Sequence, residues 1–468
     1  MHALPGMGAF ALIVLGGPLF GQGHTAAPSP VPTASAVATS TPVPKPSSTA
    51  AAEAPVFRGR IKHVVIIVQE NRSFDNLFNG FPGADTAQAG VAHDGHIIRL
   101  QPVSLTHEED LDHSHNGALM EYDAGKMDGW DLEHPDIVQK EPEKPSTLAY
   151  SYLPRNEIQP YWQLARRYVL ADRMFQPAFS ASFVAHQYLI AGQSANVIDN
   201  PDVGSDTNFF WGCDSPSDAR ALVNGQTGRG VFPCFTYRTI ADELDAAHLS
   251  WRYYAPPGNH LGALWSAFDA VRQIRYGPDW HEDVVSPETR VLADIARGDL
   301  ANVTWVVPTA SNSDHAYPRQ PRFKWVSIAT NKGPHWVGSI VNAVGKSKYW
   351  DDSAIFVLWD DWGGWYDHVA PPRLDNLGPG FRVPLIVISP YTKHGYVSHV
   401  QHEFGSILKL TEEAFGLPSL GTSDVRADDL ADCFDFAQAP HGYAMIPTKF
   451  DAAYFESHSS PDEGPDTD

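Results

Sequence analysis

Four short apolar runs divide the chain, and they predict buried β-strands. They read HVVIIVQ, VTWVVP, AIFVLW and VPLIVIS, and they begin at His63, Val303, Ala354 and Val383. Their apolar residues are continuous rather than alternating, which is typical of strands in a parallel sheet that is covered on both faces. The pattern therefore indicates a sheet buried in the middle of the molecule.

Helical periodicity appears between and after these runs. In HWVGSIVNAVG, Trp336, Ile340 and Val344 recur at helical spacing. In EFGSILKLTEEAFG one face collects the apolar residues, and Gly416 follows as a C-terminal stop. The residues of that face are Phe404, Ile407, Leu408, Thr411 and Phe415. The stretch TIADELDAAHLSWRYYA predicts a helix, a turn and a strand.

Strands that alternate with helices predict an α/β fold with a mostly parallel central sheet covered by helices on both faces. In such open sheets, ligands bind at the carboxyl ends of the strands. Side chains that follow the predicted strands are therefore the first candidates for a functional site.

Both ends of the chain differ in composition from the part between them. Residues 1–23 contain an apolar stretch, Ala9 to Phe20, that is too short and too broken by glycine and proline to span a membrane. We expect a signal peptide there and no transmembrane segment, the alternative being a start codon upstream of the true one. Residues 24–56 are rich in Pro, Ser, Thr and Ala and predict a disordered tether. Residues 57–456 form the predicted folded domain, and 457–468 an acidic disordered tail.

The charge balance limits the partners of the protein. Lys and Arg number 33 and Asp and Glu number 55, which gives a formal net charge of −22. This excess repels phosphate backbones and anionic lipid surfaces, so no general nucleic-acid binding is expected.

The cysteines favour an exported protein. Cys213 and Cys234 flank a loop rich in Gly, Pro and Asn, and a disulfide between them would stabilise the fold by roughly 3 kcal/mol. Such a bond indicates a secreted or periplasmic location. The alternative is two buried thiols in a reducing compartment, and Cys433 is expected to stay free in either case.

Polar pairs follow two of the predicted strands. Glu70 and Asn71 come directly after the first strand, and Asp360 and Asp361 come directly after the third. Adjacent side chains on a strand point to opposite faces of the sheet. Both members of a pair can therefore face one point only where the chain has already turned out of the strand. The glycines at 363–364 supply such a turn for Asp360 and Asp361. Three carboxylates and one amide would form an oxygen-rich cage for a divalent metal cation of unknown identity. The alternative for each residue alone is a helix cap or a turn former.

Histidines and serines supply the remaining candidate chemistry. Neutral histidine binds metal, and charged histidine holds a phosphate or protonates a leaving group. The candidates, each in a loop or at a helix start, are His113, His115, His186, His315 and His368. The G-x-S-x-G, H-E-x-x-H and P-loop motifs are absent from the sequence, so a hydroxyl activated by metal is the expected nucleophile. The segment FQPAFSASFVAHQYLIAGQS offers Ser180, Ser182 and Ser194.

At this point the sequence resembles a known family. The stretches HVVIIVQENRSFDNLF, GKMDGW, WVVPTASNSDH and WDDWGGWYDHV…FRVPLIVISPY are similar to the bacterial phosphoesterase family. This family includes secreted phospholipases C and a metal-dependent acid phosphatase, and it belongs to the alkaline-phosphatase-like superfamily. The resemblance runs from about Ile61 to about Phe436. It implies an alkaline-phosphatase-like fold and makes residues 57–456 a phosphoesterase catalytic domain.

The resemblance also implies roles for individual residues. The implied metal ligands are Glu70, Asn71, Ser182, Asp360 and Asp361, and the implied catalytic residues are Ser182, His113, His315 and His186. The family usually has Gly-Pro-Ser/Thr-x-Pro-Asn around the nucleophile, whereas this chain has SASFVA at 180–185. The choice of Ser182 therefore rests on its spacing to His186-Gln187-Tyr188 and to Gly192.

Three functional hypotheses follow. The first is a secreted, metal-dependent phosphoester hydrolase with a serine nucleophile, phospholipase C-like or acid phosphatase-like, acting on a phospholipid or a phosphomonoester. The second, favoured by the altered nucleophile segment, is a catalytically weak or inactive, cation-stabilised secreted binding protein on the same fold. The third is a cytosolic protein that keeps its first 55 residues.

A cluster of aromatic residues has two alternative interpretations. Its rings either bind a choline-type headgroup by cation–π contact or form a hydrophobic core behind the site. Its members are Trp359, Trp362, Trp365 and Tyr366.

Overall fold

The computed structural model describes residues 56–133, 146–203, 210–226, 230–258, 262–316 and 330–459. The chain divides into two units, Met1–Ala52 and Glu53–Asp468, and only the second contains described residues. The expected signal peptide, nearly all of the tether and most of the acidic tail lie outside the described residues, so these expectations stay predictions. Within the described ranges, no helix has the length and apolar character that a membrane span requires.

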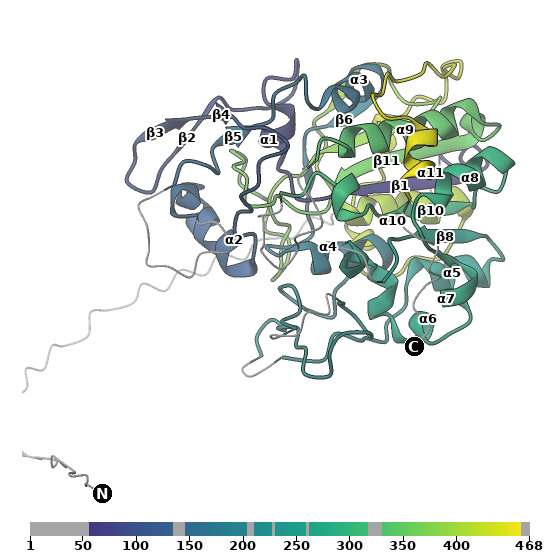
Figure 1. The fold of residues 1–468 in the computed structure, drawn as a ribbon, viewed down its shortest axis with the longest axis horizontal. Coiled ribbons are helices and arrows are strands. Elements are labelled where there is room, and N and C mark those ends of the chain that lie inside the picture. Colours follow the sequence, from purple (N-terminus) through teal and green to yellow (C-terminus); the bar gives the residue numbers. More distant parts are fainter. Residues whose placement is uncertain are drawn as a thin grey trace, which may run out of the picture. The chain divides into compact units, whose positions relative to one another are not determined.

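An eight-stranded sheet forms the centre of the second unit, in the order β13-β6-β12-β11-β1-β10-β8-β9 (Figure 1). Its strands are β1 (His63–Gln69), β6 (Val169–Ala171), β8 (Trp251–Tyr254), β9 (Val284–Val285), β10 (Val303–Val306), β11 (Ser353–Trp359), β12 (Leu385–Ile388) and β13 (Tyr396–Ser398). All neighbours pair in parallel except β12, which runs antiparallel to both β11 and β6. The predicted mostly parallel sheet is confirmed. The reversed direction of β12 was not predicted, because a strand buried on both faces has the same continuous apolar run in either direction.

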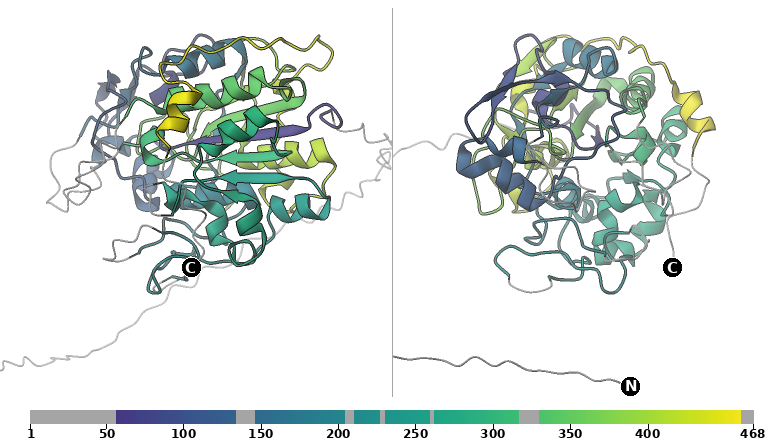
Figure 2. Two further views of the ribbon diagram at one scale, coloured as in Figure 1. Left: turned by 45° about the vertical axis from the view of Figure 1, so that its right-hand side comes forward. Right: turned by 60° about the vertical axis from the view of Figure 1, so that its left-hand side comes forward.

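Helices cover both faces of this sheet, as predicted (Figures 1 and 2). On one face α3 (Gln159–Arg167), α8 (Arg290–Arg297) and α11 (Ala452–Ser457) pack against α9 (Gly333–Lys346). On the other face α5 (Ile240–Ala246) and α10 (Phe404–Phe415) pack against α4 (Ser182–Ala191). The α/β fold class is therefore confirmed by the layers themselves.

The helices predicted from periodicity are present. In α9, Trp336, Ile340 and Val344 are fully buried, and α10 ends at Gly416, whose φ of 69° places it in the left-handed region that glycine tolerates. The predicted helix, turn and strand are α5 and β8.

Shorter elements complete the described part of the chain. They are α1 (Phe74–Phe78), β2 (Ala89–Val91), β3 (Ile97–Arg99), β4 (Gln101–Pro102), α2 (His115–Tyr122), β5 (Ser151–Tyr152), β7 (Met174–Phe175), α6 (Arg272–Arg275), α7 (Asp279–Glu282) and β14 (His402–Glu403). The strands β2 to β5 and helix α2 lie together beyond one end of the central sheet (Figure 1). A second hydrophobic cluster that includes Trp130, Trp362 and Trp365 packs there, separate from the main core.

The cysteines pair as expected. Cys213 and Cys234 form a disulfide, with 4.5 Å between their Cα atoms, and Cys433 is a buried free thiol. The disulfide closes the segment between α4 and α5, which lies on the same side of the molecule as the carboxyl end of β8 (Figure 1).

Candidate active site

The site begins where two central strands end side by side. β1 and β11 are parallel neighbours in which Gln69 lies opposite Trp359, so Glu70 and Asp360 leave the sheet at the same level. The backbone N–H of Asn71 donates to Asp360 Oδ1 over 2.9 Å. Asn71 has a φ of 60°, a left-handed conformation that asparagine tolerates better than most residues, and it turns the chain out of the strand.

Glycine at position 363 allows the two loops to approach closely. Gly363 has a φ of 63°, and a Cβ atom added there would lie 2.4 Å from the carbonyl oxygen of Asn71. Its N–H donates to Asp361 Oδ1 over 2.8 Å, which fixes that carboxylate. The turn that the sequence predicted at this position is therefore confirmed, and it aims Asp361 back toward the end of β1.

Glu70, His186 and Asp360 form a buried group that can hold a metal ion. His186 Nε2 lies 3.1 Å from Glu70 Oε1 and 3.7 Å from Asp360 Oδ2, and the three side chains are at most 2% exposed. Glu70 Oε2, Asp360 Oδ2 and both polar atoms of the Asn71 amide are buried without a hydrogen-bond partner. Because buried polar atoms without partners are costly, the three oxygen atoms of this set fit a divalent cation as their partner.

Burial and mutual repulsion set the electrostatics of this cage. Burial and the neighbouring Asp360 raise the pKa of Glu70 well above its usual value, and the same two causes raise the pKa of Asp361. Burial lowers the pKa of His186 to about 4, so its imidazole is neutral at pH 7. Neutral imidazole is the form that binds metals.

Ser182 is the serine that reaches the cage. It is the first residue of α4, and its Oγ donates to Asp361 Oδ2 over 3.1 Å. Ala181 occupies the N-cap position of α4 and makes no side-chain cap bond, so Ser182 lies inside the helix and does not cap it. Ser180 Oγ is buried without a partner, and Ser194 Oγ donates to the Val197 carbonyl away from the carboxylates.

His113 and His315 lie together beside this group. Their ring centroids are 5.6 Å apart, and each Nδ1–H donates to a nearby backbone carbonyl, which fixes the orientation of each ring. His113 also packs edge-on against Trp362, which directly follows Asp361. Burial and His113 lower the pKa of His315 well below its usual value, so His315 is neutral at pH 7. The structure thus brings both predicted histidines to the end of β11.

The sequence did not identify three further residues of this region. Asp110 joins His113 and His315 in a second buried group whose ligand atoms lie within 4.8 Å of one another, and the Asp-x-x-His spacing was the available signal. Trp265 stacks on His315 with 5.8 Å between ring centroids, and nothing in the local sequence indicates this contact. Arg72 is fully buried and donates from Nε and Nη2 to the Asp314 carbonyl, over 3.0 and 2.6 Å.

Two other candidate histidines lie elsewhere. His115 Nδ1 donates to the Phe179 carbonyl over 2.6 Å. His368 pairs with Asp75 and Asp85 in a network with Arg382, and the guanidinium there already supplies a positive charge between the acids. Neither histidine contributes to the cage at the ends of β1 and β11.

The aromatic cluster belongs to the core. Trp359, Trp362, Trp365 and Tyr366 are at most 4% exposed. Trp359 Nε1 donates to Asp314 Oδ2 over 3.0 Å, and Trp362 Nε1 donates to Glu121 Oε2 over 2.7 Å. The structure therefore supports the core alternative for this cluster, and the headgroup-cradle alternative is wrong, because these rings offer no open face.

The sequence model of the Phosphoesterase family matches residues 61–418. The chain belongs to the Phosphoesterase family. The match includes the ends of β1 and β11, the start of α4 and the two histidine loops, and it confirms the family that the sequence resembles.

Two curated relatives show how far the similarity extends. A non-hemolytic phospholipase C of Burkholderia pseudomallei is 24% identical, over 83% of this chain and 61% of its own length. Phospholipase C A of Mycobacterium tuberculosis is 25% identical, over 81% of this chain and 78% of its own length. The chain thus spans about three fifths of the length of the first of these relatives.

A solved structure of a protein in the alkaline phosphatase superfamily, from Vibrio parahaemolyticus, is 14% identical. It covers 79% of this chain and 71% of that chain, with a TM-score of 0.34. The α/β assignment rests on the sheet order and the covering helices described above.

Proposed function

We propose that this protein is an exported, metal-dependent phosphoester hydrolase with Ser182 as its nucleophile, of phospholipase C or acid phosphatase type. The observation that carries the proposal is the 3.1 Å hydrogen bond from Ser182 Oγ to Asp361 Oδ2. It lies at the edge of a buried cage in which Glu70 Oε2 and Asp360 Oδ2 have no hydrogen-bond partner. A serine in this position is held by an acid that can accept its proton. Membership in the Phosphoesterase family supports the same chemistry.

The cage residues would hold the cation. Glu70, Asn71, Asp360 and Asp361 supply oxygen atoms, Ser182 supplies its hydroxyl, and His186 is an added candidate ligand because it lies against Glu70 and Asp360. A divalent cation bound there would make the serine hydroxyl more acidic and would neutralise charge on the phosphate. Oxygen donors with one imidazole suit several divalent ions, so the chemistry of the donor set does not select one.

Each protein residue then has a defined step. Ser182 Oγ attacks phosphorus while Asp361 accepts its proton, and the bond from phosphorus to the substrate oxygen breaks. The departing oxygen takes a proton from His113 in its protonated form, which leaves a phosphoserine and a neutral His113. The start of α4 favours the phosphate charge through the positive end of the helix dipole. His315, neutral at pH 7, then accepts a proton from the water that attacks phosphorus and releases Ser182.

The substrate is a phosphate ester of a lipid or of a smaller alcohol. Both relatives carry the name phospholipase C, which favours phosphodiesters of lipids. The disulfide between Cys213 and Cys234 supports export, because such bonds persist in oxidising compartments.

A second candidate function is a secreted binding protein that keeps the cation without turnover. The observation that favours it is the apolar, buried Ala185, which stands where the family pattern has asparagine. The loss of that amide removes a polar group close to the nucleophile.

Hydrolysis assays separate the two functions. The purified protein is tested on p-nitrophenyl phosphate, p-nitrophenyl phosphorylcholine and phosphatidylcholine, each with and without chelator. We expect release of product that chelator abolishes and metal restores. Bound metal without hydrolysis of any of the three would favour the binding protein.

A further inference from the structure

The loops that follow three neighbouring strands meet at one edge of the central sheet. β1 lies between β10 and β11 and runs parallel to both. The loop after β1 begins at Glu70, the loop after β11 carries Asp361, and the loop after β10 carries His315. Arg72 lies in the middle loop, two residues after Glu70, and is fully buried. Because burying a guanidinium is costly unless it is well bonded, its contacts indicate what it does.

The guanidinium of Arg72 contacts both neighbouring loops. Its Nε and Nη2 donate to the Asp314 carbonyl, in the loop after β10, over 3.0 and 2.6 Å. Its Cζ lies 4.8 Å from the centroid of the Trp365 ring, in the loop after β11. A planar fork that also stacks on an aromatic ring has a fixed orientation, and lysine cannot reproduce it. Arg72 therefore ties the middle loop to the loops on both sides.

The carbonyl that Arg72 holds belongs to the peptide unit of His315. The Asp314 carbonyl and the His315 N–H lie in one planar group, so a fixed carbonyl also fixes the point from which the His315 side chain starts. The His315 N–H donates to Ser313 Oγ over 3.3 Å, and its Nδ1–H donates to the Ala316 carbonyl over 2.6 Å. These local bonds orient the ring, and the fork of Arg72 anchors the main chain that carries it.

The carboxylate of Asp314 is held by separate partners. Its Oδ2 accepts a hydrogen bond from Tyr161 OH over 2.8 Å and another from Trp359 Nε1 over 3.0 Å. Tyr161 lies on α3, and Trp359 is the last residue of β11, so both donors come from regular elements. These partners restrain the side chain of Asp314, whereas Arg72 restrains the main chain next to His315.

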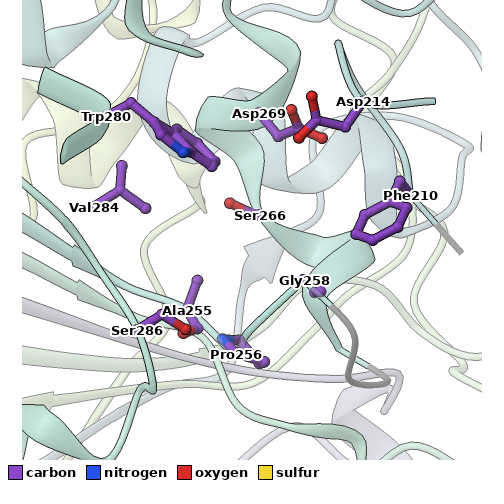
Figure 3. A pocket seen from close by; sticks show the side chains of 11 residues that line it. Phe210, Asp214, Ala255, Pro256, Gly258, Ser266, Asp269, Trp280, Val284 and Ser286 are labelled. Atoms are coloured by element: carbon purple, nitrogen blue, oxygen red, sulfur yellow. The ribbon is translucent and has the colours of Figure 1, made fainter. Parts of the chain in front are cut away.

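An aromatic ring packs against His315 as well. Trp265 stacks on it, with 5.8 Å between ring centroids and 29° between ring planes. Trp265 directly precedes Ser266, which lines a pocket at the carboxyl end of β8 (Figure 3). The His315 ring is thus restrained by a stacked indole and through the main chain that Arg72 holds. A shift of that main chain would move the imidazole relative to the cage.

We propose that Arg72 is a positioning residue, which holds His315 in place for the attack of water on the phosphoserine. This inference rests on the proposed function. In that step water gives a proton to His315, its oxygen bonds to phosphorus, and Ser182 Oγ leaves with the proton that Asp361 holds. Arg72 acts through the Asp314 carbonyl. Its loss should slow the release of phosphate but not the formation of phosphoserine, because the bond from Ser182 to Asp361 does not involve it.

The first test separates the two steps of the reaction. Wild type and Arg72→Met are mixed rapidly with p-nitrophenyl phosphate, whose leaving group departs without a proton. In Arg72→Met we expect a burst of p-nitrophenol at the wild-type rate and then a steady rate lowered about 10²-fold, while phosphoserine accumulates. Metal content should equal that of wild type. A burst slowed as much as the steady rate, or a loss of metal, would overturn the proposal, because Arg72 would then act on the cage.

The second test asks whether Arg72 acts through His315. His315→Gln alone should show the same burst and slow steady rate. Adding Arg72→Met to it should lower the steady rate by less than about threefold more, because the residue that Arg72 positions is already gone. A combined loss equal to the product of the two single losses would mean that the two residues act independently, and would contradict the proposal.

Binding of inorganic phosphate distinguishes positioning from contact with the substrate. Calorimetric titration of phosphate into the metal-loaded protein should give a Kd in Arg72→Met within about threefold of wild type. Binding weakened tenfold or more would make Arg72 a substrate-binding residue instead.

A lysine variant keeps the test valid if Arg72→Met does not fold. Arg72→Lys keeps the charge and one donor but loses the fork, so we expect the burst to remain and the steady rate to fall about tenfold. The matched control is Arg382→Lys, because Arg382 is also fully buried and donates from Nε to Asp367 over 2.8 Å. Its steady rate should stay within about threefold of wild type. Equal losses in the two lysine variants would mean that any buried arginine disturbs the site, and would sink the specific role of Arg72.

Failure of the proposed function gives a different result. Hydrolysis without phosphoserine in wild type, Arg72→Met and His315→Gln would refute the serine nucleophile, and the role of Arg72 with it. Phosphoserine that forms and is hydrolysed at the wild-type rate in Arg72→Met would refute the role of Arg72 alone and leave the proposed function intact.

Discussion

Ser182 Oγ and Asp361 Oδ2 lie 3.1 Å apart although 179 positions separate them in the chain. The hydrogen bond joins the start of α4 to the loop after β11, and β11 in turn places Asp360 next to the end of β1. The proposed nucleophile, its proposed proton acceptor and the carboxylate cage are thereby held by three rigid elements. Such placement is what a site needs in order to hold reacting groups at fixed distances.

The carboxylates should bind the metal. Asp360→Asn and Glu70→Gln each remove one charge from the cage, so each should weaken metal binding at least tenfold and reduce activity in parallel. Metal content by elemental analysis and initial rates on p-nitrophenyl phosphate check this. The control Asp94→Asn should keep both.

The variants Asp360→Asn and Glu70→Gln also test whether these two carboxylates serve only to stabilise the fold. Removing a carboxylate that burial and repulsion make unfavourable should leave the metal-free protein at least as stable as wild type, as thermal unfolding in chelator would show. Full metal occupancy together with a large loss of stability would mean that these residues are caps and turn formers.

The histidine pair should affect chemistry and not metal content. His315→Gln and His113→Gln remove the groups proposed to move protons, and we expect kcat to fall 10²–10⁴-fold with metal occupancy unchanged. His115→Gln is the matched control, since this ring bonds to the Phe179 carbonyl away from the cage. Loss of metal in the His315 and His113 variants would instead make them ligands, together with Asp110.

The disulfide should stabilise the fold. Cys213→Ser with Cys234→Ser removes a bond that closes a loop of 21 residues, and we expect a loss of about 3 kcal/mol in the free energy of unfolding. Denaturant titration measures it. Cys433→Ser controls for the substitution, because that thiol is free. Equal stability with and without reductant would contradict a formed bond.

Export should remove about the first 23 residues, because the apolar stretch ends at Phe20 and small residues follow. Intact mass of protein recovered from the medium or the periplasm gives the mature start. A mature chain that begins at Met1 would refute the signal peptide.

Patterns of apolar and polar residues within single segments predicted the strands and helices that those segments form. The apolar runs of β1 and β11 marked buried strands, and the polar residues directly after them marked the cage, because parallel strands bring their carboxyl ends to one edge. The period of 3.6 residues marked α9 and α10. Strands β6, β9 and β13 were missed because two or three residues are too few to show any period.

Contacts between distant segments left little trace in the sequence. Trp265 meets His315 only through packing, and Asp110 is one of many acids in an acidic chain. Sequence spacing favoured Ser182 over the neighbouring serines, and the hydrogen bond from its hydroxyl to Asp361 supports that proposal, whereas Ser180 Oγ has no hydrogen-bond partner.

The nucleophile is the most direct test of the account. The protein is mixed rapidly with substrate, quenched in acid and digested, and phosphorylated peptides are mapped for wild type, Ser182→Ala and the control Ser180→Ala. We expect phosphate on Ser182 in wild type and in Ser180→Ala. In Ser182→Ala we expect neither phosphopeptide nor turnover, with the fold intact by circular dichroism. Phosphate on Ser180 or Ser194, or full activity of Ser182→Ala without a covalent intermediate, would contradict it and would point to direct attack by water.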